Sequence, residues 1–141
     1  YERFKKLVRD NLSTAEQQHK QVEDLVKACD DPLPFQCTGE SVISSADRDV
    51  VKIRILNVSV KARQLILHGP GARLLKLPLV ASQHAAGAEH MLHGVSQDKT
   101  VYCENLKNFF SKEKELLTER LTRIAEKIKV LRDVCKKFVV V

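Results

Sequence analysis

Residues 99–138, KTVYCENLKNFFSKEKELLTERLTRIAEKIKVLRDVCKKF, decide the fold that we expect for this chain. Apolar residues recur here at alternating steps of four and three, a spacing that keeps side chains on one face of a 3.6-residue helix. The members of this stripe are Leu117, Leu121, Ile124, Ile128, Leu131, Cys135 and Phe138. The positions between them are mostly charged. The stretch therefore predicts one long amphipathic helix, whose apolar face must pack against a partner surface.

A second amphipathic helix is predicted at residues 1–29. Its stripe follows the same rhythm and has a single polar member, His19. The full stripe is Val8, Leu12, Ala15, His19, Val22, Val26 and Cys29. The helix is expected to end before Pro32, because proline lacks the backbone donor that a helix needs and disfavours helical geometry in the residue before it. Residues 30–40 are therefore predicted to be a connector.

Residues 45–68 are compatible with two kinds of secondary structure. As a helix, they would begin at a cap formed by Ser44 or Ser45. Acidic residues would occupy the first turn and basic residues the end, as the helix dipole favours. The Gly-Pro pair at 69–70 would stop this helix. As strands, they would use the β-branched residues of 50–60 and a hairpin turn at the same Gly-Pro pair.

We favour the helix at 45–68 because its cap, its charges and its four-three spacing agree with one another. The expected fold is all-α: an antiparallel four-helix bundle with long first and last helices. The predicted helices of this single domain, 1–141, cover about 1–29, 45–68, 79–93 and 99–138. The alternative is an α+β fold in which an antiparallel helical hairpin flanks a small β-meander at about 50–80. The first residue is Tyr1 and the last three are valines, so we expect a domain excised from a longer chain.

The four cysteines stand far apart in the sequence and form none of the close pairs typical of zinc or redox motifs. They are Cys29, Cys37, Cys103 and Cys135. We interpret them as free thiols, which favours a reducing compartment, the cytoplasm or the nucleus. No apolar run approaches the ~20 residues of a membrane-spanning helix, so no transmembrane segment is predicted.

Polar residues suggest little chemistry. His84, Glu89, His90 and His93 form the only group with the composition of a metal site, and their spacing matches no standard zinc signature. The serines, cysteines and histidines form no recognisable nucleophile motif. The sequence therefore predicts no catalytic residue, no cofactor and no metal, and the protein is not expected to be an enzyme.

Charge and helix length suggest a function in assembly. Residues 99–138 hold eleven Lys or Arg against six acids, whereas residues 30–49 hold one Arg against five acids. The last helix would be about 57 Å long, more than its neighbours are expected to cover, so it should engage another chain. We expect a non-catalytic protein–protein interaction or scaffold module that binds an acidic partner chain or itself. The alternative is a nucleic-acid-binding module that uses the basic last helix. The expected contact residues are Lys127, Leu131, Arg132, Cys135, Lys136, Lys137 and Phe138.

Overall fold

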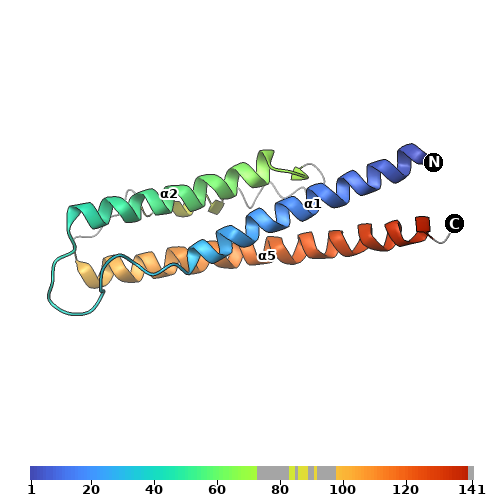
Figure 1. Ribbon diagram of the computed structural model, residues 1–141. Helices are drawn as coiled ribbons and strands as arrows, with labels where there is room; N and C mark the ends of the chain where they lie inside the picture. Colours follow the sequence, from blue (N-terminus) through green and yellow to red (C-terminus); the bar gives the residue numbers. More distant parts are fainter. Residues whose placement is uncertain (73–82, 85, 89–90, 92–97, 140–141) are drawn as a thin grey trace.

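Three long helices dominate the structure, a computed structural model that describes residues 1–72, 83–84, 86–88, 91 and 98–139. The helices are α1 (Glu2–Cys29), α2 (Ser45–His68) and α5 (Lys99–Val139). They run along one common axis, with α1 antiparallel to both α2 and α5, so the N-terminal and C-terminal ends lie at the same end of the molecule (Figure 1). None of the helices in the described part of the chain combines the length and the apolar character that a membrane span requires.

The middle of the chain is helical, which confirms the all-α class for the described residues. The hydroxyl of Ser44 accepts a hydrogen bond from the backbone N–H of Asp47 at 3.1 Å and caps the start of α2. At the other end, the N–H of Gly69 bonds to the carbonyl of Leu65 at 3.1 Å. The β-meander alternative is wrong over residues 50–68, and no strand occurs in the described residues. Burial at the helical period outweighs the β propensity of the branched side chains.

The third predicted helix, at 79–93, falls mostly outside the described residues. Positions 83–84, 86–88 and 91 are helical. The described part of this segment contributes Ala88 and Met91 to the core, together with the buried His84. The four-helix bundle is therefore established only at the coarser level of a helical packing around α1, α2 and α5.

The buried face of α1 shares four members with the predicted stripe, has Gln18 and Leu25 in place of His19 and Val26, and leaves Leu12 only partly buried. Its buried residues are Val8, Ala15, Gln18, Val22, Leu25 and Cys29. Gln18 is fully buried, whereas His19 is partly exposed and lies 4.0 Å from the carboxylate of Glu23 on the flank of the helix. The buried polar residue of α1 is therefore Gln18, whose amide donates to the carbonyls of Leu65 and Pro70 at the end of α2.

Helix α5 has covering elements at both of its ends. It has 41 residues and is about 60 Å long. Near its start, the ring of Tyr102 stacks on Phe35 of the connector, with centroids 6.1 Å apart. Near its end, the ring of Phe138 meets Phe4 edge-on at 5.8 Å. The part of α5 that was expected to extend beyond its neighbours is thus packed by the chain itself, because the connector covers the start of α5 where α1 has already ended.

Candidate functional site

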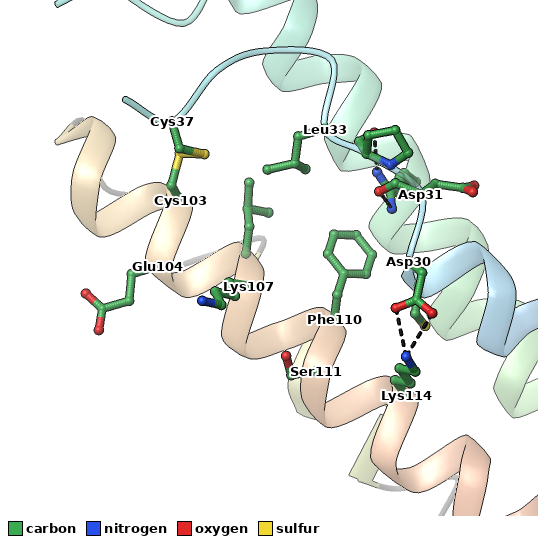
Figure 2. A pocket seen from close by; sticks show the side chains of 14 residues that line it. Asp30, Asp31, Leu33, Cys37, Cys103, Glu104, Lys107, Phe110, Ser111 and Lys114 are labelled. Atoms are coloured by element: carbon green, nitrogen blue, oxygen red, sulfur yellow. Dashed lines mark hydrogen bonds and ion pairs between the residues drawn. A yellow bond between two sulfur atoms is a disulfide. The ribbon is translucent and has the colours of Figure 1, made fainter. Parts of the chain in front are cut away.

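A cleft of about 720 Å³ lies between the first half of α5 and the connector that follows α1 (Figure 2). Leu33 of the connector and Phe110 of α5 give it apolar walls. On its rim, the Nζ atom of Lys114 binds both carboxylate oxygens of Asp30, at 2.8 and 2.9 Å. This ion pair joins the end of α1 to the middle of α5.

Arg54 of α2 holds the same connector from the other side. Its guanidinium donates to the carbonyls of Ala28 at 3.1 Å and Pro32 at 3.2 Å, and also to the carbonyl of Asp31. Its central carbon lies 4.6 Å from the centroid of the Phe110 ring, a cation–π contact. These bonds give side-chain donors to carbonyls of the last turn of α1 and of the start of the connector. Arg54 therefore holds the start of the connector against α2.

Two of the cysteines form a disulfide, so the prediction of four free thiols is wrong. Cys37 of the connector is bonded to Cys103 of α5, with Cα atoms 6.0 Å apart, although the two residues are 66 positions apart in the sequence. Cys29 and Cys135 are free. A spacing analysis misses this pair, because only the fold brings the connector onto α5. The disulfide also removes the basis on which the sequence favoured a reducing compartment.

The free thiol of Cys29 lines the cleft but is a poor nucleophile. Burial, and then the charges of Glu113 and Asp30, raise its pKa to about 11. It is therefore neutral near pH 7, and the thiolate is the reactive form of cysteine. The described residues of this cleft connect the end of α1 to α5 and α2 through the Asp30–Lys114 ion pair and the hydrogen bonds of Arg54.

The histidine group considered as a metal site is only partly described. His84 is fully buried, and its Nδ1 atom is paired with the carboxylate of Glu113 of α5. The hydroxyl of Ser59 on α2 donates to the His84 carbonyl at 3.0 Å. Glu89, His90 and His93 lie outside the described residues. Within the described ones, no group of three or more His, Cys, Asp or Glu side chains could hold a metal ion.

The apolar members of the predicted contact set belong to the core. Leu131 is buried, and Cys135 and Phe138 are half-buried and pack against the same core cluster. The ring of Phe138 meets Tyr1 at 6.1 Å and Phe4 at 5.8 Å, both edge-on. These apolar residues therefore pack within the chain, and Phe138 contacts the start of α1.

The cationic members of the set face outward to different degrees. Lys136 and Lys137 are exposed, and Lys127 is half-buried. Arg132 is exposed and lies 3.5 Å from the carboxylate of Glu16, an ion pair between α5 and α1. The structure therefore gathers the predicted cations at the end of the molecule where α1 begins.

The start of α1 adds further cations that sequence analysis missed. Arg3, Lys6 and Arg9 are exposed. Residues 1–9 and 127–139, which we call the basic end, hold nine Lys or Arg against two acids, a net of +7. The whole chain carries only +6, so the remaining residues sum to −1. Charge counts on each helix end, combined with an antiparallel pairing of first and last helices, would have found this concentration.

Exposed apolar side chains accompany these cations. Phe4 is 52% exposed, Leu7 58% and Val130 56%. The Nζ atom of Lys5 lies 4.3 Å from the centroid of the Tyr1 ring. The basic end therefore offers charge and apolar area together, the combination found in protein interfaces.

Comparison with known protein families, with curated proteins and with solved structures finds no match to this chain. Its class, over the described residues, is that of an all-α protein built from three long helices.

Proposed function

We propose that this chain is a non-catalytic protein–protein interaction module that binds an acidic surface of a partner protein at the basic end. The concentration of charge supports this most directly. A net charge of +7 lies on residues 1–9 and 127–139, and the remainder is almost neutral. A field of one sign at one end attracts and orients an anionic partner before contact.

Few of the charges at the basic end are neutralised within the chain. Lys5 pairs with Glu2 at 3.5 Å, and Arg132 pairs with Glu16 at 3.5 Å. The other cations of this end make no ion pair with the residues that the structure describes; they are Arg3, Lys6, Arg9, Lys127, Lys129, Lys136 and Lys137. Their ammonium and guanidinium groups are therefore available to carboxylates of another chain.

A protein fits this surface better than the nucleic acid that the sequence offered as the alternative. Phe4, Leu7 and Val130 add apolar area that a phosphate backbone would not use. Acids stand among the cations, and Asp133 would repel phosphates that follow α5. A partner with carboxylates around a small apolar patch complements both features.

Binding of a fluorescent acidic peptide, rich in glutamate and containing two leucines, tests this proposal. Replacing both Lys136 and Lys137 by glutamate should lower the affinity for the peptide by about tenfold or more, because each lost cation becomes a repelling charge. The matched control is the double change Lys107→Glu and Lys112→Glu. These lysines are exposed on the same helix but near its other end, and their replacement should leave affinity within about twofold.

Equal weakening by the two double variants would contradict the proposal, because the attraction would then follow total charge and not the basic end. Tighter binding of duplex DNA than of the peptide, with a steep fall in affinity as salt rises, would instead favour the nucleic-acid alternative.

A further inference from the structure

We propose that the outward face of α2 is a second binding site, which accepts an amphipathic helix with acidic residues along both edges of its apolar stripe. This face is distinct from the basic end and involves no residue of it. It is formed by five apolar side chains at helical spacing, which we call the outer stripe: Val50, Ile53, Leu56, Val60 and Leu67.

The outer stripe lies on the side of α2 that faces away from the core. The buried residues of this helix are Val51, Ile55, Val58, Ser59, Ala62 and Ile66. At 100° per residue, the outer stripe is centred almost opposite to them. Each of its side chains is between 36% and 58% exposed. A helix with apolar residues on both faces is normally buried on both, so this one lacks a neighbour in the described structure.

Cations border the outer stripe. Lys52 and Arg63 follow one edge, and Lys61 follows the other; all three are exposed and make no ion pair with the described residues. From residue 50 to residue 68 the helix has four Lys or Arg and no acid. Asp49, at the start of the stripe, is the nearest exception. An occupant with glutamate or aspartate beside its own apolar stripe would neutralise these edges.

The surface next to the outer stripe is concave. Lys61 and Gln64 line a groove of about 680 Å³ between α2 and α1. Its other wall includes Gln21, Leu25 and Ala28 of α1, together with Asp24, whose carboxylate is paired with Lys20 at 3.0 Å. A rod-shaped occupant along α2 could therefore contact two helices, as in helix-in-groove recognition. The stripe extends over most of α2, which is about 36 Å long for its 24 residues.

A second copy of this chain is a poorer occupant. Two copies of α2 packed face to face would bring cationic edges together in either orientation, because both edges carry Lys or Arg. A membrane surface is also less suitable, since the stripe contains no aromatic residue and adjoins a groove. An acidic helix satisfies the apolar stripe, the charged edges and the concave shape together.

The test uses a synthetic helical peptide as long as α2, with leucines at alternating steps of three and four and glutamates beside them. A matched peptide has lysine at every glutamate position. The full chain should bind the glutamate peptide about tenfold or more tightly than the lysine peptide. Ile53→Asp and Val60→Asp should each reduce binding of the glutamate peptide by about tenfold or more, because each places a carboxylate in the apolar contact.

Two controls make this result specific to α2. Val101→Asp introduces the same group at an exposed apolar position on α5 that belongs neither to the outer stripe nor to the basic end, and it should leave binding unchanged. Because all three positions are exposed, circular dichroism and thermal unfolding should show that the variants remain folded. The combined change Lys52→Glu and Arg63→Glu should reverse the preference in favour of the lysine peptide.

Several results would overturn the assignment. Equal affinity for both peptides would show adhesion without charge recognition. Undiminished binding by Ile53→Asp would place the peptide elsewhere. Light scattering that shows a dimer abolished by Ile53→Asp would make a second copy the occupant. Binding to phosphatidylserine vesicles that is lost in Ile53→Asp, without binding of either peptide, would make it a lipid surface. Both probes are acidic, so the variants tell the two sites apart. Ile53→Asp should leave binding of the basic-end peptide unchanged, and the combined change Lys136→Glu and Lys137→Glu should leave binding of the helical peptide to α2 within about twofold.

Discussion

The Nε atom of Arg120 donates a hydrogen bond to the Oε1 atom of Gln18 at 2.9 Å and thereby ties α5 to α1 inside the core. The amide nitrogen of Gln18 donates to the carbonyls of Leu65 at 3.1 Å and Pro70 at 2.7 Å, at the end of α2. One glutamine therefore connects three helices. Both side chains are almost fully buried, and burial lowers the pKa of Arg120. Among the residues that the structure describes, the Nη1 and Nη2 atoms of the guanidinium have no hydrogen-bond partner, so this cation depends strongly on Gln18.

Replacement of Gln18 by leucine should lower the free energy of unfolding by about 3–5 kcal/mol, because the buried guanidinium loses its acceptor. In a chain that already carries Arg120→Met, the same replacement should cost only about 1–2 kcal/mol, the penalty of removing the amide donor from the carbonyls of Leu65 and Pro70. Chemical denaturation of the four proteins measures this coupling. Additive costs would show that the two side chains do not depend on each other.

The disulfide between Cys37 and Cys103 should be a major source of stability. Closing a loop of 66 residues in the unfolded chain corresponds to about 4 kcal/mol in the chain-entropy account. The double change of these residues to serine should therefore lower the free energy of unfolding by about that amount. Cys135→Ser is the matched control and should have little effect, because its thiol is free and half-buried. Titration of four thiols in unreduced, denatured protein would show that the bond is absent.

The Cys29 thiol should resist alkylation. With a pKa of about 11, roughly one molecule in a thousand carries the thiolate at pH 8, and the side chain is also buried. Iodoacetamide at pH 8 should therefore modify Cys135 at least about ten times faster, as peptide mass spectrometry can measure. Comparable rates would contradict the burial of Cys29.

The same raised pKa predicts a loss of stability in alkali. The thiol retains its proton in the folded protein at pH values where the unfolded chain has released it. The contribution of Cys29 is therefore complete below about pH 9 and disappears as the pH rises toward 11. Between pH 8 and pH 10.5, the denaturation midpoint of the native chain should fall more than that of Cys29→Ala. An equal fall would assign the alkaline loss to other groups.

The cap of α2 should contribute about 1 kcal/mol. Ser44→Ala removes the acceptor for the N–H of Asp47 at 3.1 Å and should destabilise the protein by about that amount. Ser45→Ala is the matched control, because Ser45 is the first residue of the helix and its neighbour supplies the cap. Thermal unfolding that shows equal effects of the two changes would contradict this role of Ser44.

The helices were predictable because each carries local signals. A cap at Ser44, acids in the first turn and a stop at Gly69 agree with the period of α2, so its helical interpretation over 45–68 matches the structure. The length of α5 follows from its uninterrupted stripe. The functional surfaces were less accessible to prediction. Leu131, Cys135 and Phe138 have the pattern of a seam for another chain, but a stripe does not reveal which surface covers it.

Local patterns in the sequence predict the three helices and their ends and favour the all-α class over the α+β alternative, because propensity, capping and periodicity act between residues that are close along the chain. Tertiary packing establishes the pairing of Cys37 with Cys103, the burial of Gln18 against Arg120 and the union of two charged helix ends in the basic end. These contacts join positions 66 or more residues apart, and such pairs are set by how the amphipathic faces pack together and not by any local pattern.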